Sequence, residues 1–477
     1  MKASRKKILW GVVLVVVLLL GCGLYYLAQM AATGAGYKAK ILCSGVFVSN
    51  RDAESVLGED VALASMRLID ARIDREARTV TATALGGLVK RKAIFREGLG
   101  ATMVVDVSEE ELRAQAVGDL TPLPTNQQDL PWPTGDVTPS EEPPAGVDMQ
   151  RLADALDEAF SEPDTERPRR TRAVVVVYDG HIVAERYAAG FTKDTPLLGW
   201  SMTKSVTNAL VGILVGQGKL SVDEPAPVPE WSSPGDPRGA ITLDQMLRMS
   251  SGLEFGEVYE DPLSDVCVML FGTRDAAAYA AAKPLETEPG SKWYYSSGTT
   301  NIISRIVRDA VGGTLVDYFA FPRRALFDRI GMRSAVIEPD PSGTFVGSSY
   351  MYATARDWAR FGLLYLQDGV WEGERILPEG WVDYSRKPTS GSPGGVYGAH
   401  FWLNPTRRPD ESGESVRVSL SAPRLPADMF SALGHEGQSV TIIPSRKMVI
   451  VRLGLSQAPG TWDTDSFIAN VLEAVPE

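Results

Sequence analysis

Cysteine and histidine are scarce in this chain, and each occurs only three times in 477 residues. Zinc sites are built largely from these two residue types, often with a His-Glu-x-x-His run, and no such run is present. The three histidines, His181, His400 and His435, are also far apart in the sequence. The sequence therefore offers few candidate ligands for a catalytic zinc ion.

Dense positive charge is missing as well. The formal net charge is −12, and the one compact basic run, Lys2 to Lys7, lies directly before an apolar segment. A polyanion such as a nucleic acid needs a basic surface, so we expect no nucleic-acid partner.

A long apolar run without charged residues does occur, from Ile8 to Met30, and it is long enough to cross a bilayer. The basic residues 1–7 before it predict a cytoplasmic N-terminus and an exported body, periplasmic or at the cell surface. Three interpretations compete: an uncleaved anchor over residues 8–30, a signal peptide cleaved near Ala31-Ala32, and a lipoprotein signal ending at Cys22. We favour the anchor, because apolar residues continue past Cys22 to Leu27.

Cys43 and Cys267 would lie in the exported, oxidising region, where a disulfide between them could tie the N-terminal part to the body. Two buried free thiols fit the sequence nearly as well, because spacing along the chain gives no distance in space.

Beyond the anchor, residues 37–117 alternate charged turns with short β-rich runs at Ile41 to Val48, Thr79 to Ala84 and Ala101 to Val107. They predict a small accessory β-rich region. Residues 118–147 are rich in proline and predict an extended, semi-rigid connector that separates this region from a domain over residues 148–477.

Strand patterns lie near both ends of that last domain, with helical patterns between them. Two hairpins are predicted, one from Ala173 to Tyr187 with an Asp179-Gly180 turn and one from Ser439 to Leu453. Helices are predicted at Met149 to Phe160 and at Ser466 to Val475. This order indicates an α+β fold, with an antiparallel sheet flanked by helices and an inserted helical region.

Ser201 and Lys204 form the most informative pair. Val206, Leu210 and Ile213 lie at helical spacing behind them, and glycines at 216 and 218 would end the helix. A helix places residues three apart on one face, and a desolvated lysine can activate a serine hydroxyl. A serine at a helix N-terminus can also be only an N-cap, and this segment alone does not separate the two interpretations.

Two further motifs follow in order, Tyr295-Ser296-Ser297 and His435-Glu436-Gly437. Together with Ser201-Met202-Thr203-Lys204, they resemble the serine β-lactamase and penicillin-binding-protein superfamily. Within it they resemble the class C β-lactamase-like esterases and 6-aminohexanoate-oligomer hydrolases. The resemblance covers about residue 149 to the C-terminus. It implies the β-lactamase/transpeptidase-like fold and makes an α/β-hydrolase, suggested by Gly199-Trp200-Ser201, a distant second.

The resemblance also implies roles. Ser201 would be the acylated nucleophile, Lys204 the amine that keeps its proton mobile, and Tyr295 a second base whose pKa an adjacent ammonium lowers. The backbone N–H groups of Gln438 and Ser201 would form the oxyanion hole. Substrate-side positions are His435, the close-approach residue Gly437, Ser297 and Tyr259 with Trp402 at the pocket mouth. No metal or organic cofactor is needed.

Two departures shape the expected substrate. His435 stands where β-lactamases of the superfamily carry lysine, and Ser297 stands where class C enzymes carry asparagine. The first removes a permanent cation, and the second removes an amide that could grip an acyl side chain. Glu436 adds negative charge. An uncharged or cationic ester or amide therefore suits the site better than a penicillin.

The leading hypothesis is an exported, membrane-anchored serine hydrolase of small esters or amides. One rival is a D-amino-acid peptidase or amidase that reaches cell-wall peptides across the connector. The other is a non-catalytic binding or sensor module that keeps the fold.

Overall fold

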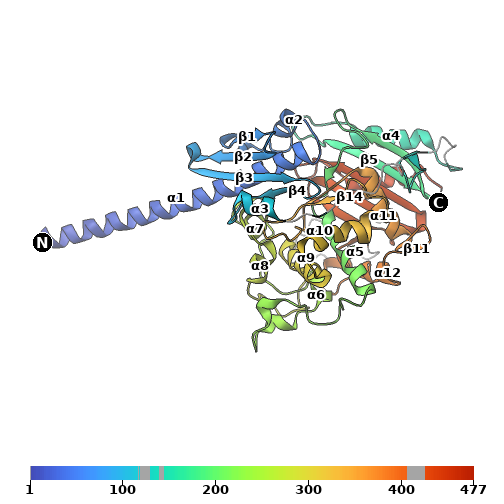
Figure 1. Ribbon diagram of the computed structural model, residues 1–477. Coiled ribbons are helices and arrows are strands. Elements are labelled where there is room, and N and C mark those ends of the chain that lie inside the picture. The colour runs from blue at the N-terminus through green and yellow to red at the C-terminus, as the bar shows by residue number, and fades with distance from the viewer. Residues whose placement is uncertain (1, 116–117, 119–128, 139–143, 405–424, 477) are drawn as a thin grey trace.

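The computed structural model describes residues 2–115, 118, 129–138, 144–404 and 425–476 (Figure 1). At its centre is a six-stranded antiparallel sheet in the order β12-β13-β14-β15-β5-β6. Its strands are β5 (Thr171–Tyr178), β6 (His181–Tyr187), β12 (Trp402–Leu403), β13 (Phe430–Gly434), β14 (Gln438–Ile443) and β15 (Met448–Gly454). Both predicted hairpins are confirmed, and strands from the two ends of the domain pair as β15 with β5.

The alternation of valines along β5 assigns each face of this sheet to a different layer. Val174 and Val176 are buried against α4 (Met149–Phe160) and α13 (Thr464–Leu472), the two predicted terminal helices. Val175 and Val177 belong to the larger core on the other face. This two-faced burial follows from the period of two in a strand.

The inserted helical region fills the opposite face. It comprises α5 (Met202–Gly216), α6 (Leu243–Leu247), α7 (Asp265–Gly272), α8 (Ala276–Ala281), α9 (Ser297–Val311), α10 (Leu315–Pro322), α11 (Ala355–Leu366) and α12 (Trp381–Ser385). Short strands β7 (Leu197–Leu198), β8 (Val336–Ile337), β9 (Met351–Ala353), β10 (Val370–Trp371) and β11 (Glu374–Arg375) lie between them. Helix α11 packs closely on the sheet, since a Cβ at Gly362 would come within 2.4 Å of Val449. The mixed α and antiparallel β architecture that we predicted is present.

The N-terminal part differs from the prediction. One helix, α1, runs without interruption from Lys2 to Phe47, so the strand predicted at Ile41 to Val48 is wrong. Its last four turns pack on a four-stranded antiparallel sheet, β1 (Asp70–Asp74), β2 (Thr79–Ala84), β3 (Val89–Arg96) and β4 (Gly100–Met103). Helices α2 (Ala53–Gly58) and α3 (Glu109–Ala114) complete this accessory region. The apolar side chains that looked strand-like are buried by helix-on-sheet packing instead.

Helix α1 is also fastened to the central domain by a buried carboxylate. Glu338 binds Lys40 Nζ in an ion pair, accepts from Ser44 Oγ at 2.8 Å, and accepts from the backbone N–H of Ala101 at 2.6 Å. The ammonium of Lys40 also lies 4.1 Å from the centre of the Tyr350 ring. One side chain thus holds α1, the accessory sheet and the β8–β9 region together.

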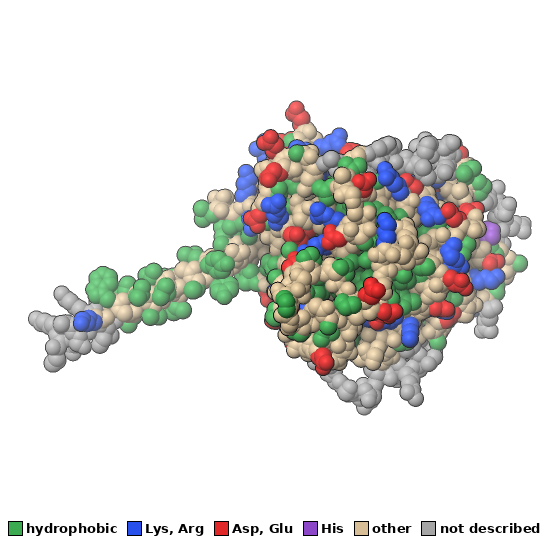
Figure 2. Space-filling model, turned by 60° about the horizontal axis from the view of Figure 1, so that its bottom comes forward, with side chains coloured by type: hydrophobic (Ala, Val, Ile, Leu, Met, Phe, Trp, Pro, Cys, Tyr) green, Lys and Arg blue, Asp and Glu red, His purple; other side chains and the backbone are tan. Residues whose placement is uncertain are grey.

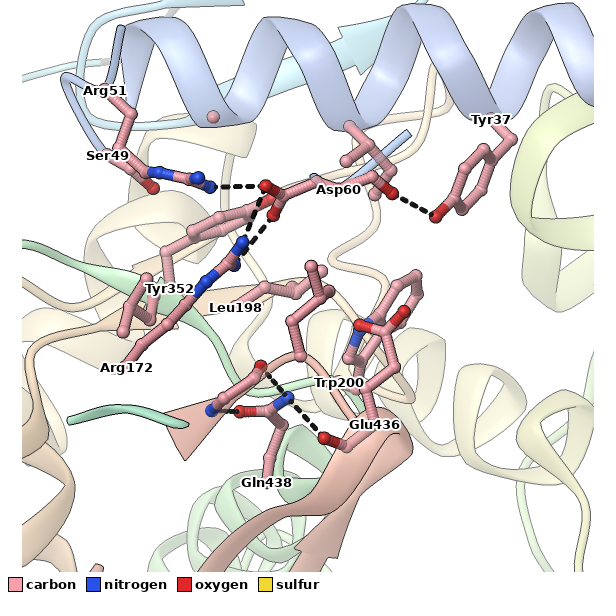
Figure 3. Close-up of a pocket in the computed structure, with 15 residues that line it drawn as sticks. Tyr37, Ser49, Arg51, Asp60, Arg172, Leu198, Trp200, Tyr352, Glu436 and Gln438 are labelled. Carbon is pink, nitrogen blue, oxygen red and sulfur yellow. Dashed lines mark hydrogen bonds and ion pairs between the residues drawn. The ribbon is translucent and has the colours of Figure 1, made fainter. Parts of the chain in front are cut away.

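A second charged contact lies after the end of α1, where Arg51 and Asp60 flank α2 and meet Arg172 (Figure 3). Asp60 is held by Arg51 Nη1 at 2.7 Å and by Arg172 of β5 at 2.8 Å. Burial alone would raise the pKa of Asp60, but the two guanidinium groups outweigh it and hold the pKa below its usual value. The accessory region is therefore packed against the central domain.

The proline-rich connector does not hold the two parts at a distance. Within its described residues, Trp132 is buried, its ring faces the Arg360 guanidinium at 4.7 Å, and its indole N–H donates to Gly180 O at 3.0 Å. Arg360 of α11 also donates to Pro133 O at 2.8 Å. Of the predicted connector, residues 118, 129–138 and 144–147 are described, and the other residues lie outside the described part of the chain.

The cysteines are free, so the proposed Cys43–Cys267 disulfide is wrong. Cys43 is buried between α1 and the accessory sheet, whereas Cys267 is buried in the main core. Burial raises the pKa of the Cys267 thiol to about 11, which keeps it protonated.

The first part of α1 projects away from the body as an apolar rod (Figures 1 and 2). From Trp10 to Met30 its large side chains are exposed, and the most apolar window has a mean hydropathy of 2.5 with no residue buried. Among the described residues, it is the one helix long and apolar enough to cross a membrane. A signal sequence would have the same length and composition.

We predict that Lys40→Met and Glu338→Gln each lower the free energy of unfolding by about 3–5 kcal/mol, because each leaves an unpaired buried charge. The double variant should lose less than the sum of the two. Urea unfolding of the full chain in detergent, followed by tryptophan fluorescence, measures this.

The matched control is Arg78→Met, which breaks a surface pair with Glu97 whose two side chains are 52% and 84% exposed. That change should cost far less. Equal losses in the control and in Lys40→Met would contradict a special contribution from the buried pair.

Candidate active site

Ser201 lies at the turn from β7 into α5. Gly199 donates its N–H to Met351 O at 2.8 Å, and Trp200 then adopts a left-handed φ of +48° that delivers Ser201 to the helix start. A bulky residue in this region is strained, and such strain is common at functional sites. The Ser201 hydroxyl makes no capping bond to the helix, so the reading of Ser201 as only an N-cap is not supported.

Lys204 points back toward that hydroxyl from the first turn of α5. Its Nζ is 3.1 Å from Ser201 Oγ, 3.0 Å from Ser297 Oγ and 3.1 Å from Ser348 O. The side chain is almost entirely buried, and this burial lowers the pKa of Lys204 to about 8, although the charge of Glu257 opposes the shift. An amine with this pKa exists partly in its neutral, basic form near neutral pH.

Glu257 is a member of this network that the sequence analysis missed. It accepts from Ser297 Oγ at 2.5 Å and from Ser297 N at 2.8 Å, so Ser297 bridges the carboxylate and the Lys204 amine. Burial raises the pKa of Glu257, although Lys204 opposes this. The available signal was its place two residues before Tyr259, but the sequence offers no reason to pair it with Ser297.

The sequence analysis placed Ser297 on the substrate side, but in the structure it lies within the Lys204–Glu257 network instead. It is fully buried at the start of α9, and both neighbours of its hydroxyl belong to the charged pair.

Tyr295 joins Ser201 and Lys204, as predicted from the motifs. Lys204 Nζ lies 4.6 Å from the centre of its ring, and Trp402 stacks on the other side with ring centres 5.5 Å apart. The expected downward shift of its pKa is wrong. Burial, followed by the charge of Glu257, raises the pKa of Tyr295 above its usual value, while a hydrogen bond with Ser201 only partly offsets this. The phenol therefore keeps its proton.

His435 and Tyr259 meet at the edge of the site, although 176 positions separate them in the sequence. Their rings stack with centres 5.0 Å apart and an angle of 15°, and the edge of Trp200 meets His435 at 5.8 Å. His435 remains exposed, whereas Tyr259 is half-buried. The three rings form a wall beside the nucleophile.

The turn His435–Gly437 joins β13 to β14 and brings Gln438 next to the nucleophile loop. Gly434 comes so close to this loop that a Cβ there would lie 2.1 Å from Gly199 O. Buried Arg452 donates to the carbonyls of Glu436 and Gly437, both at 3.1 Å. Gly437 has φ +82°, and a Cβ there would meet the Arg452 guanidinium at 2.6 Å, so the near neighbour of this glycine is Arg452 and its substrate-side role stays a prediction.

The side chain of Gln438 is occupied elsewhere. It donates to Gly454 O at 2.7 Å and accepts from Gly454 N at 2.9 Å. Only its backbone N–H is a candidate for binding an oxyanion.

His400 is a second residue that the sequence analysis did not place in the site. Its Nδ1 is 2.9 Å from Lys204 O, and its Nε2 is 3.2 Å from Thr300 Oγ1. Burial, and then the nearby Lys204 charge, lower the pKa of His400 to about 3, so the ring is neutral. It supports the α5 backbone without adding charge. Within the parts of the chain described, no group of three or more His, Cys, Asp or Glu side chains is placed to hold a metal ion.

Comparisons with known proteins identify the family of the chain. The family model described as Beta-lactamase matches residues 156–467. The 6-aminohexanoate-dimer hydrolase of Paenarthrobacter ureafaciens is 28% identical over an alignment of 318 positions, and the alignment covers 61% of this chain and 74% of that protein.

Solved structures are similar in fold. A penicillin-binding protein homologue from Caulobacter crescentus has a TM-score of 0.52 at 17% identity, and the superposition covers 68% of this chain and 96% of the homologue. A family VIII carboxylesterase has a TM-score of 0.50 at 16% identity, covering 69% of this chain and 96% of its own. Because the family model spans more than half of the sequence, the chain belongs to the Beta-lactamase family and is a hydrolase of the serine type.

Proposed function

We propose that this protein is an exported, membrane-tethered enzyme that hydrolyses small ester or amide bonds through an acyl-enzyme on Ser201. The observation that carries the proposal is the Lys204 amine, which lies 3.1 Å from Ser201 Oγ and has a pKa lowered to about 8. A serine hydroxyl needs such a neighbouring base to become a nucleophile.

Acylation uses Lys204 and Tyr295 in different roles. Neutral Lys204 accepts the Ser201 proton while Ser201 Oγ bonds to the substrate carbonyl carbon. The backbone N–H groups of Ser201 and Gln438 stabilise the resulting oxyanion. Protonated Tyr295 donates to the leaving alcohol or amine as its bond to the carbonyl carbon breaks, and the proton on Lys204 replenishes the phenol. Water then attacks the acyl carbon and gives a proton to the same relay, which returns a proton to Ser201 Oγ as the bond between Oγ and the acyl carbon breaks and the acid is released.

Substrate charge follows from the residues around the nucleophile. Glu257 lies beside Ser297 in the same network, and Glu436 accepts from the indole N–H of Trp200 at 3.2 Å. No lysine stands at the His435 position to bind a substrate carboxylate. These features favour an uncharged or cationic substrate over a penicillin.

The location of the enzyme follows from α1. Its apolar part, residues 8–30, would cross the membrane with the basic residues 1–7 in the cytoplasm, which leaves the catalytic domain on the outer side. Residues 32–47 of the same helix are packed in the body. The tether and the enzyme would therefore be joined by continuous helix.

Ser201→Ala should abolish labelling by a serine-reactive fluorophosphonate and lower ester hydrolysis by about 10³-fold or more, because the nucleophile is gone. Intact-mass spectrometry measures the adduct. Ser232→Ala, which removes an exposed serine, is the control and should label like wild type. Equal labelling of Ser201→Ala and wild type would sink the catalytic assignment. A Ser201 adduct of an ester substrate that forms but never hydrolyses would favour a binding or sensor module.

Glu257→Gln should move the rising limb of the kcat/KM profile to lower pH. In wild type this limb reports loss of the Lys204 proton, with a pKa of about 8. The Glu257 carboxylate favours the ammonium, so its removal lowers the Lys204 pKa further and makes the neutral base available at lower pH. Stopped-flow hydrolysis of an activated ester over pH 6–10 measures the shift.

Glu254→Gln, an exposed carboxylate on the same loop, is the control and should leave the limb in place. If Glu257→Gln lowers activity by one factor at every pH, Glu257 only shapes the loop.

Tyr295→Phe should slow hydrolysis of an ethyl ester by about 10²–10⁴-fold and a 4-nitrophenyl ester much less, because nitrophenolate leaves without a proton. Paired kcat measurements on the two esters of one acid test the role. Equal losses on both would show that the phenol does not protonate the leaving group.

A further inference from the structure

A cavity of about 270 Å³ lies between the N-terminal helix and the wall of rings beside Ser201. Its lining comes from three parts of the chain: α1 at Thr33, Gly34 and Tyr37; the 3-10 helix η1 (Ala64–Leu68); and the catalytic domain at Tyr259, Phe271 and His435. The volume is near the lower end of pockets that hold small organic molecules, roughly 300–1,000 Å³. Most of the lining is apolar, so an apolar group would fit it.

This cavity begins where the exposed apolar part of α1 ends. Met30 is the last large exposed side chain of that part, and Thr33 and Gly34 already line the cavity. With a helical rise of 1.5 Å per residue, Gly34 is about 6 Å along the axis from Met30. If residues 8–30 span the bilayer, the cavity opens within the interfacial layer.

The end of the accessory sheet that faces the same way carries exposed leucines. Leu68 is 85% exposed and Leu88 is 88% exposed. Leu88 follows the β2–β3 turn, and the register places the start of β1, next to Leu68, beside the end of β2. A Cβ at Gly34 would lie 2.9 Å from Ile69, which fixes this end next to the emerging helix (Figure 1).

Basic side chains accompany these leucines. Arg67 precedes Leu68 and Lys90 follows Leu88 by two positions, and both are exposed. Leucines beside exposed basic residues suit a bilayer surface, where apolar side chains enter the acyl boundary and basic side chains lie near anionic headgroups. Without a bilayer or another partner, both leucine side chains would stay exposed to water.

The cavity also borders the residue that precedes the nucleophile. Trp200 is one of its walls, and so is the Tyr259–His435 stack. Figure 3 draws a neighbouring pocket that shares Tyr37, Trp200 and Glu436 with this cavity. A chain held in the cavity would therefore lie against Trp200, the neighbour of Ser201 in the chain.

We propose that this cavity binds the acyl chain of a membrane-resident amphiphile, an ester or amide whose carbonyl then meets Ser201. The inference rests on the proposed function, because the bond cleaved is the one already assigned to the acyl-enzyme reaction. It adds the substrate class: an uncharged or cationic acyl compound that enters from the bilayer surface along α1.

The test uses the full chain reconstituted in phosphatidylcholine vesicles that contain phosphatidylglycerol, with 4-nitrophenyl acetate and 4-nitrophenyl dodecanoate as substrates. Ser65→Phe places a ring in the cavity, and Ala64→Phe places the same ring on the neighbouring exposed position, which does not line it. We expect wild type to prefer the dodecanoate. Ser65→Phe should lower the dodecanoate-to-acetate ratio of kcat/KM about tenfold, whereas Ala64→Phe should keep that ratio.

A second arm tests the bilayer as the source. The double variant Leu68→Asp/Leu88→Asp should slow hydrolysis of vesicle-embedded dodecanoate at least several-fold relative to the same ester in detergent micelles. Equal rates in both settings would overturn delivery from the membrane.

The outcomes separate the two proposals. If acetate is hydrolysed in a Ser201-dependent way but Ser65→Phe and Ala64→Phe give the same ratio, the acyl cavity is wrong and the serine hydrolase stands. If neither ester is hydrolysed and Ser201 takes no fluorophosphonate, the proposed function itself has failed.

Discussion

The Glu338 carboxylate is the contact on which the arrangement of the molecule depends. It lies buried where Lys40 of α1, Ser44 of α1 and the backbone of Ala101 converge on the catalytic domain. A buried carboxylate without partners would cost several kcal/mol, so helix, sheet and domain are held in one arrangement that satisfies it. In that arrangement Tyr37 of α1 and Trp200, which come from different parts of the chain, line one cavity. The N-terminal helix is thus a wall of the enzyme as well as a candidate membrane span.

The same trade between burial and charge governs the catalytic centre. Lys204 loses water on all sides, which favours its neutral form, and Glu257 recovers part of the charged form through Ser297. Tyr295 receives no compensating cation strong enough to offset its burial, so it stays protonated. One desolvated pocket therefore holds an amine with a lowered pKa and a protonated phenol, which are the base and the acid of the proposed acyl transfer.

The sequence predicted much of the catalytic domain because its signals are local. The helix at Met149–Phe160 and the Asp179-Gly180 hairpin follow from periodicity and turn chemistry over a dozen residues. The strand at Ile41 to Val48 failed for the complementary reason. Its apolar residues suit either element, and the choice was made by a helix already running from the N-terminus and by the sheet on which it packs. The packing of the described part of the connector was equally hidden, since nothing local shows that Trp132 meets Arg360, 228 positions away.

What the sequence by itself determined was the chemistry available: a serine and a lysine one helical turn apart, a tyrosine and a histidine motif in order, and an apolar segment behind a basic start. The order of these motifs was enough to indicate the family. Only the tertiary structure decided the protonation states, the bridging position of Ser297, the partnership of Glu257 and the meeting of His435 with Tyr259. These depend on burial and on distances between segments far apart in the chain, and a pKa or a cavity exists only once those segments have excluded water together.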